Sequence, residues 1–216
     1  MYLPQRFREA DVAAVRALAR AHPFASLVTA PIVDGTPAPF VSHLPLLLEL
    51  GDGTRPDLLR GHMARANPQW RHFEGGEVLA VFSGPHAFVS SMWSERPDQQ
   101  VPTWNYLVAH AYGRARVLED PSDTLSVLAA LMAAHQPEAS PVALDPPAPL
   151  AIELVRAIVA FEIPVARWEA KSKLSQNRTA EDRALIEERL RSRGALWDRE
   201  IADAMARTKG STDPSG

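Results

Sequence analysis

Short apolar runs with strand-like alternation recur along this chain, and most of them are separated by turn residues rather than by helices. The runs are Phe24 to Ala30, Phe40 to Leu50, Leu58 to Met63, Glu77 to Ser83, His86 to Ser90, Pro102 to Leu118 and Val159 to Glu169. Asp34-Gly35 predicts a hairpin between the first two runs, and Gly84-Pro85 predicts a turn between the fourth and fifth. Because a doubly wound fold needs strands and helices to alternate, the pattern favours a mainly β (α+β) fold, an antiparallel β-barrel with peripheral helices.

Helical patterns lie between and after these runs. They span Glu9 to Ala21, Pro68 to Phe73 with Asn67 as N-cap, Leu125 to His135, Leu150 to Ala157, Thr179 to Arg193 and Ala195 to Arg207. We therefore expect a barrel domain over residues 1–178 and a helical extension packed on it over 179–208. The polar residues 209–216 are expected to be a disordered tail.

Composition excludes several classes of protein. The chain has no cysteine, which removes disulfides, thiolate chemistry and cysteine-ligated metal sites. Its net charge of -3 gives no general attraction to nucleic acid or to an acidic membrane. We find neither an apolar signal-peptide core nor a run of membrane-spanning length, so a cytoplasmic protein without a membrane partner is expected.

The polar stretch from Lys171 to Arg178 follows the last strand-like run and precedes a helical segment. It carries three cations, two hydroxyls and two amides. Such a junction suits an anion like phosphate, because a helix N-terminus offers unsatisfied N–H groups and a partial positive charge. The alternative is an ordinary polar connection in which Ser175 or Asn177 is the N-cap of the helix.

Three further places combine residues that are able to bind a ligand. Ser42 and Leu44 point to one face of their strand and His43 to the other. The segment from Gly61 to Pro68 ends a strand and starts a helix. Arg65 in this segment is able to form two parallel hydrogen bonds with a phosphate. Trp93, Trp104 and Tyr106 offer rings that cover a planar ligand by stacking. Core packing, a surface arginine and buried aromatic residues are the alternatives at these places.

Other chemistries lack their motifs. The seven histidines form neither an H-E-x-x-H nor an H-x-H pattern, so no metal site is predicted. There is no G-x-S-x-G elbow, no G-x-G-x-x-G loop and no Walker A loop. No catalytic residue is therefore assigned.

Several long blocks resemble the PaiB family, described as FMN-binding negative transcriptional regulators. They are Met1-Tyr2-Leu3-Pro4, Phe24 to Thr29, Ser42 to Leu48, Gly61 to Trp70, Gly84 to Ala87, Val101 to Tyr106 and Lys173 to Arg178. The resemblance runs in order from residue 1 to about residue 195. It implies an FMN-binding split β-barrel, and a homodimer with the flavin near the subunit interface.

The resemblance also implies roles for individual residues. Ser42, His43 and Leu44 would flank the isoalloxazine, and His62, Arg65 and Asn67 would lie near the phosphate. Lys173, Gln176, Asn177 and Arg178 would close the site at the end of the barrel, from the same or the other subunit. Trp104 belongs to the same expected site through its ring. Ser172 departs from the family pattern, which has a larger residue there.

The resulting hypothesis is a homodimeric, FMN-binding negative transcriptional regulator that acts through flavin or ligand sensing. An FMN-dependent oxidoreductase or flavin reductase is the first alternative, and a haem-binding split barrel with a histidine ligand is the second. A repressor that contacts DNA directly is a further alternative. It has little support, because the sequence has no helix-turn-helix signature and no basic stripe.

Overall fold

The computed structural model describes residues 1–136 and 148–208, and the chain divides into two compact units. One unit comprises Met1–Leu18, Ser83–Ala109 and Glu169–Gly216, and the other comprises Ala19–Phe82 and His110–Trp168. We call them the terminal unit and the central unit. Three long strands contribute residues to both: β7 (Val78–Val89), β8 (Thr103–Gly113) and β10 (Ile158–Lys173). The domain boundary expected at residue 178 stays a prediction, and the tail 209–216 lies outside the described residues.

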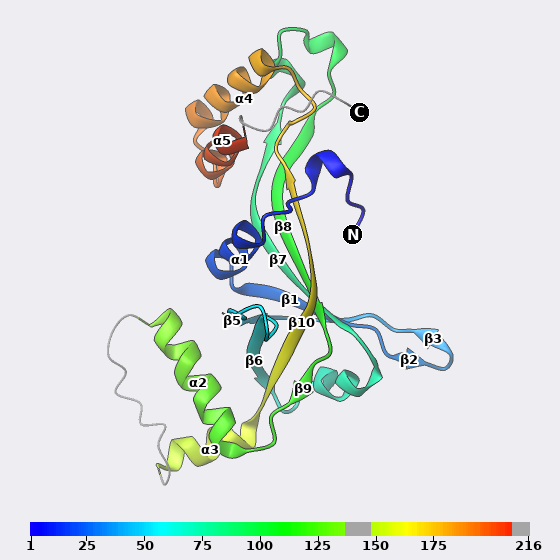
Figure 1. The fold of residues 1–216 in the computed structure, drawn as a ribbon, viewed down its shortest axis with the longest axis vertical. Coiled ribbons are helices and arrows are strands. Elements are labelled where there is room, and N and C mark those ends of the chain that lie inside the picture. The colour runs from blue at the N-terminus through cyan, green and yellow to red at the C-terminus, as the bar shows by residue number, and fades with distance from the viewer. Residues whose placement is uncertain (137–147, 209–216) are drawn as a thin grey trace. The chain divides into compact units, whose positions relative to one another are not determined.

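The sheet is mainly antiparallel (Figure 1). Its remaining strands are β1 (Phe24–Thr29), β4 (Phe40–Pro45), β5 (Leu47–Glu49), β6 (Leu58–Ala64) and β9 (Arg116–Val117). In the described part of the chain the strand order is β4-β1-β7-β8-β10-β6-β5, and β9 pairs with β10. The pairs β1–β4, β1–β7, β5–β6, β6–β10 and β9–β10 are antiparallel.

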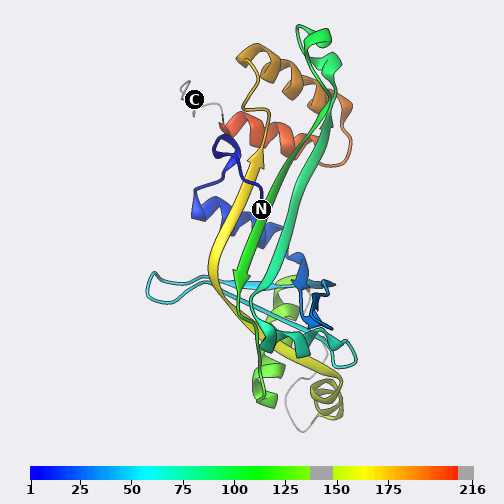
Figure 2. The ribbon, with the colours of Figure 1, turned by 90° about the vertical axis from the view of Figure 1, so that its right-hand side faces the viewer.

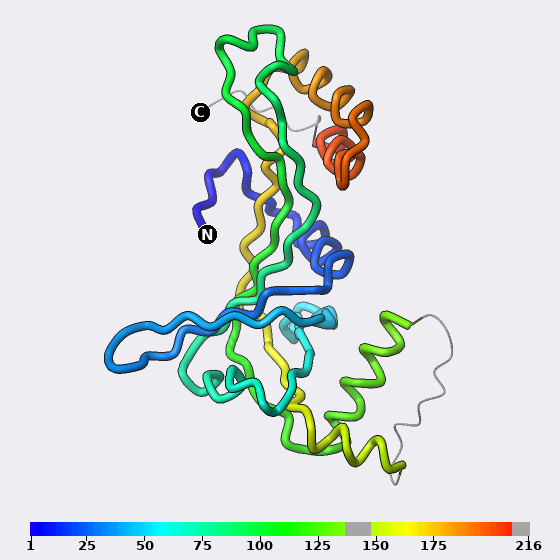
Figure 3. The backbone as a smooth tube through the Cα atoms, turned by 180° about the vertical axis from the view of Figure 1, so that it is seen from behind, coloured from blue at the N-terminus to red at the C-terminus, as the bar shows by residue number. Residues whose placement is uncertain are grey.

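The predicted hairpin between the first two strands is confirmed. β1 and β4 continue into a small ribbon, β2 (Ile32–Val33) and β3 (Thr36–Pro37), as Figure 3 shows. Asp34 and Gly35 at its tip have φ of 51° and 76°, the positive values that a tight hairpin turn requires. The register pairs Ser42 with Leu27 and His43 with Ser26, so neighbouring candidate residues do lie on opposite faces.

The predicted turn at Gly84-Pro85 is wrong, because β7 continues through it. Gly84 is buried, and a Cβ atom there would lie 2.6 Å from Leu18 Cδ1 and 3.2 Å from Leu107 Cβ. The glycine thus allows α1 (Val12–Ala21) and β8 to approach the strand closely. Close packing, rather than a change of chain direction, explains this residue.

In the terminal unit two helices lie against the strands (Figure 2), and they share an apolar core with them. The helices are α4 (Ala180–Arg193) and α5 (Asp198–Arg207), and Gly194 ends the first of them in the left-handed conformation, with φ 63°. Their core contains Ala87, Val89, Leu174, Ile186, Leu190, Ile201, Ala202, Ala204 and Met205. Short 3-10 turns complete the unit: Gln5–Phe7, Ser91–Trp93 and Pro97–Gln99.

The alternative considered for the polar stretch, an N-cap at Ser175 or Asn177, is wrong. β10 extends to Lys173, and a turn separates it from α4, whose N-cap is Thr179. The Thr179 hydroxyl accepts a hydrogen bond from the Asp182 N–H at 3.1 Å. The polar stretch therefore belongs partly to the strand and partly to this turn.

In the central unit the helices are α2 (Pro121–His135), α3 (Pro149–Ala157) and the 3-10 helix η2 (Pro68–Gly75). Val127 and Leu131 of α2 pack with Ala160 of β10. α2 also packs against α3 through Leu125, Leu128 and Ala151. No helix within residues 1–136 and 148–208 has the length and the apolar character that crossing a membrane requires.

Candidate functional site

The expected site residues fall into two groups, one in each unit. The terminal-unit group contains Trp104, Lys173, Gln176, Asn177 and Arg178. The central-unit group contains Ser42, His43, Leu44, His62, Arg65 and Asn67. Each group is described by itself.

The cations of the terminal-unit group have only neutral partners. Lys173 Nζ donates to the Trp104 carbonyl at 2.7 Å and to the Thr103 hydroxyl, and Arg178 Nη2 donates to the Val101 carbonyl at 3.2 Å. Lys171, which was not among the predicted binding residues, donates to the Tyr2 carbonyl at 3.3 Å. None of these three side chains forms an ion pair within the described residues. The positive charge here is thus uncompensated, which is a favourable environment for an anion.

This environment lowers the pKa of Lys173. Burial lowers the pKa of the ammonium group below its usual value, and repulsion from Lys171 and Arg178 lowers it further. A bound phosphate would oppose both effects, because it attracts the charged form and accepts its hydrogen bonds.

Trp104, whose backbone carbonyl accepts a hydrogen bond from Lys173, has an exposed ring. The side chain is 52% exposed on β8. Its ring packs edge to face with Phe88, at 5.8 Å between centroids, and lies 5.9 Å from the ring of His86. These neighbours orient the indole and leave part of it free, as stacking on a planar ligand requires.

The two predicted amide side chains in the turn after β10, Gln176 and Asn177, have different roles. Gln176 is committed to the backbone, because its side chain accepts from the Leu174 N–H at 2.7 Å and donates to the Ser172 carbonyl at 2.5 Å. Asn177 is exposed, and its amide makes no hydrogen bond within the described residues. Gln176 therefore shapes the turn, whereas Asn177 is free to bind a ligand.

A buried contact that the sequence analysis missed anchors this turn. Ser175 adopts a left-handed backbone, with φ 60°, and donates its hydroxyl to Asn105 Oδ1 at 3.0 Å. Asn105 is fully buried and donates to Met205 Sδ at 3.4 Å. The Val101 to Tyr106 block contained Thr103 and Asn105, but only its aromatic residues were considered as candidates.

In the central unit the structure joins Ser42 to Asn67. Asn67 Nδ2 donates to Ser42 Oγ at 2.8 Å, and Asn67 Oδ1 accepts from the Gln69 N–H at 3.0 Å, which confirms Asn67 as an N-cap. The same interactions leave both residues largely committed to holding η2 on β4.

The neighbours of Ser42 do not join this pair. His43 is exposed on the opposite face of β4, 3.0 Å from Ser26 Oγ through Nδ1, and its ring stacks on Phe24. Leu44 is buried in the core.

His62 has a buried ring nitrogen that the fold does not use. Its Nδ1 makes no hydrogen bond within the described residues. Burial lowers the pKa of the imidazole, so the ring is neutral at pH 7. A neutral imidazole with an unused nitrogen fits a hydrogen-bonding ligand better than it fits the charge of a phosphate.

Arg65 is occupied by the end of α3. Its Nε donates to the Arg156 carbonyl at 2.8 Å, and its Nη2 donates to the carbonyls of Val155, at 3.2 Å, and Ile158, at 2.7 Å. These are carbonyls that a helix C-terminus leaves without intrahelical partners, and a guanidinium is a suitable cap for them. Only Nη1 remains for a phosphate.

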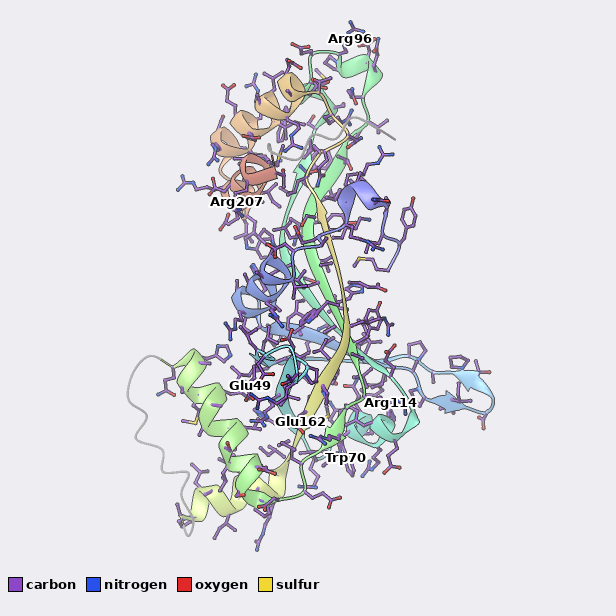
Figure 4. The ribbon with its side chains drawn as sticks, in the orientation of Figure 1. Glu49, Trp70, Arg96, Arg114, Glu162 and Arg207 are labelled. Carbon is purple, nitrogen blue, oxygen red and sulfur yellow. The ribbon has the colours of Figure 1, made fainter. Side chains whose placement is uncertain are left out.

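We expect Arg65→Ala to destabilise the protein by about 1–3 kcal/mol, because the substitution leaves the terminal carbonyls of α3 without these charge-assisted bonds. Urea unfolding of the purified variant measures the loss. Arg114→Ala is the matched control, since Arg114 is exposed and makes no hydrogen bond within the described residues (Figure 4). Equal stabilities of the two variants would contradict the capping role.

The residues present fit FMN. Its phosphate needs cations and N–H donors, which Lys173 and Arg178 provide, and its ring needs an apolar surface, which Trp104 provides. The unused nitrogen of His62 is a separate indication of a ligand in the central unit.

Comparison with known families gives the same cofactor. The family model described as "Putative FMN-binding domain" matches residues 1–167, more than three quarters of the chain. The chain belongs to this FMN-binding domain family. FMN is therefore its cofactor. The match ends before Lys171, so the assignment of the stretch from Lys171 to Arg178 depends on its geometry.

Individual relatives are similar over most of the chain. The chain is 34% identical over 211 residues to "Protease synthase and sporulation protein PAI 2" of Bacillus subtilis, covering 95% of this chain and 96% of that one. An uncharacterised protein of Emericella nidulans is 32% identical, with coverage of 85% and 87%.

Solved structures of similar fold confirm the split barrel. The flavocytochrome Anf3 of Azotobacter vinelandii aligns with a TM-score of 0.58 at 20% identity, covering 82% of this chain and 75% of that one. An FAD and haem binding protein of Mycobacterium smegmatis aligns with a TM-score of 0.56 at 17% identity, covering 82% and 78%. The curled antiparallel sheet with peripheral helices is thus the flavin-binding split-barrel fold.

Proposed function

We propose that the terminal-unit group binds FMN and that the protein acts as a flavin-dependent regulator. The observation that supports this most directly is the set of cations without a carboxylate partner, one of which donates to the backbone carbonyl of Trp104, a residue with an exposed indole. Lys173 and Arg178 hold the phosphate, Trp104 stacks on the ring, and Asn177 offers its free amide. When bound, FMN supplies hydride and electron exchange. The chain's contribution is to bind and orient the cofactor.

The central-unit residues have a different basis. The family resemblance implies that Ser42, His62 and Asn67 lie near a flavin. The unused nitrogen of His62 supports a ligand beside that residue, whereas Ser42 and Asn67 bind each other and hold η2 on β4. Arg65 caps α3, so we assign the phosphate to Lys173 and Arg178 instead. Separate variants in each unit test the two assignments independently.

Titration of the purified protein with FMN, followed by absorbance and flavin fluorescence, tests the proposal. We expect saturable quenching at one FMN per chain. NAD(P)H consumption by the loaded protein then separates an oxidoreductase from a regulator that only senses the flavin. Absence of saturable binding at micromolar FMN would refute the flavin site.

A homodimer is the proposed assembly. The outer face of the β1–β4 hairpin exposes Phe24 and Val41, with 67% and 48% of their surface accessible, and burying such side chains favours association. Light scattering coupled to gel filtration measures the mass. A monomer at micromolar concentration would overturn this part of the proposal.

We infer that regulation proceeds through the flavin or a protein partner rather than through a DNA-reading helix. The net charge of -3 supports this, because nonspecific DNA affinity depends on cations facing the phosphates. A salt-sensitive, sequence-specific shift of promoter DNA by the purified protein would refute it.

A further inference from the structure

A pocket in the central unit is lined by none of the residues that we assign to the flavin, although Arg60 in its lining is two positions from His62 on β6. It has a volume of about 170 Å³ and is lined by Arg60, Leu118, Asp123, Ser126, Val127 and Glu162. Arg60 comes from β6 and Glu162 from β10, whereas Asp123, Ser126 and Val127 come from α2. The pocket thus separates the start of a helix from two paired strands.

The strand side of the pocket is a balanced chain of charges. Glu162 is 4% exposed and accepts hydrogen bonds from Arg60 Nε, at 3.4 Å, and from Arg116. Arg60 Nη1 also donates to Glu49 at 2.9 Å, and Glu49 and Glu162 lie close together in Figure 4. Two arginines therefore balance two glutamates, which fixes the position of the Arg60 guanidinium.

The polar groups that remain are not used by the fold. Asp123 and Ser126 are exposed and Arg60 is half-buried, and the Asp123 carboxylate, the Ser126 hydroxyl and Arg60 Nη2 make no hydrogen bond or ion pair within the described residues. Asp123 and Ser126 are three positions apart on α2, so they lie on the same face of the helix. Asp123 in the first turn also interacts favourably with the helix dipole, but that role does not account for the pocket.

We propose that this pocket binds the zwitterion of a small α-amino acid. The ammonium group binds the Asp123 carboxylate and the Ser126 hydroxyl, and the carboxylate binds Arg60 Nη2. Leu118 and Val127 provide the apolar part of the lining, and the volume limits the ligand to a short side chain. A metal ion does not suit the pocket, because the described residues contain no cluster of three metal-ligating side chains.

The proposal is independent of FMN, so its test measures binding and not activity. Isothermal titration of the full-length protein compares three probes: L-alanine, L-alaninamide, which lacks the carboxylate, and N-acetyl-L-alanine, which lacks the ammonium group. We expect saturable binding of L-alanine and at least about tenfold weaker binding of the other two, because L-alaninamide lacks the carboxylate that binds Arg60 Nη2 and N-acetyl-L-alanine lacks the ammonium group that binds Asp123.

Variants locate the binding. Asp123→Asn is expected to weaken L-alanine binding by at least about tenfold, and Ser126→Ala to weaken it by a smaller factor. Glu119→Gln is the matched control, because Glu119 is an exposed acid outside the pocket lining. Lack of saturable binding of L-alanine at millimolar concentration overturns the proposal. Equal binding of L-alanine and L-alaninamide, or equal effects of the variants at 119 and 123, overturns it as well.

Discussion

Replacing Lys173 by methionine is expected to weaken FMN binding by about 10- to 100-fold and to change riboflavin binding by less than about threefold. Riboflavin differs from FMN only in lacking the phosphate, so the ratio of the two dissociation constants isolates the phosphate contact. Lys173 has neutral hydrogen-bond partners and two cationic neighbours, so its charge is available to an anion. Methionine keeps most of the length of the side chain and removes only the charge and the donors.

Fluorescence titrations with both flavins give the ratio. Arg207→Met is the control, because it removes a cation from the exposed end of α5 in the same unit (Figure 4). An equal loss of affinity for FMN and riboflavin in Lys173→Met would indicate that the residue only supports the fold of the turn. A loss of the phosphate preference in Arg65→Ala instead would move the phosphate to the central unit.

The same contact makes FMN binding dependent on pH. The pKa of Lys173 lies below the usual lysine value of 10.5, so the ammonium loses its proton at a lower pH than an ordinary lysine does. The preference for FMN over riboflavin is therefore expected to decline as pH rises through this lowered pKa. Lys173→Arg, which stays charged throughout, is expected to keep the preference constant. Titrations with both flavins across the alkaline range measure it.

The sequence predicted correctly those turns and helix ends that depend only on the residues at that position in the chain. The Asp34-Gly35 turn, the Asn67 cap and the helix end at Arg193 each follow from one conformational or hydrogen-bonding requirement. The Gly84-Pro85 turn was wrong, because glycine also serves close packing, and the packing partners Leu18 and Leu107 are distant in sequence.

The candidate site was likewise only partly predictable from the sequence, because its contacts join residues that are distant in the chain. The stretch from Lys171 to Arg178 was identifiable from its charges, and the turn at its centre depends on the buried Asn105, about 70 residues earlier in the chain. Arg65 had the residue type and the position expected of a phosphate ligand, yet the carbonyls at the end of α3 bind most of its guanidinium. Residue type shows which groups are able to bind an anion, but only the tertiary contacts show which of them are still free.

Gly113→Ala is expected to destabilise the protein by about 3 kcal/mol or more, which corresponds to a decrease in Tm of roughly 6–12 °C for a chain of this size. Gly113 is the last residue of β8 and is buried against β10. A Cβ atom there would overlap the Pro164 carbonyl oxygen and would lie 2.8 Å from Ile163 Cγ2. A flexible side chain is able to move away from such a contact, whereas a backbone carbonyl moves only if the two strands separate.

Thermal unfolding followed by circular dichroism measures this effect, and Gly75→Ala is the matched control. Gly75 ends η2 without a positive φ, and a Cβ atom there would meet no atom within 4 Å. The control should therefore match the parent protein or exceed its stability slightly, because alanine restricts the unfolded chain more than glycine does. If both variants unfold at the same temperature, then β8 and β10 are not packed as closely at Gly113 as the structure shows. A selective loss at Gly113 would instead establish that the pairing of these strands depends on a residue without a side chain.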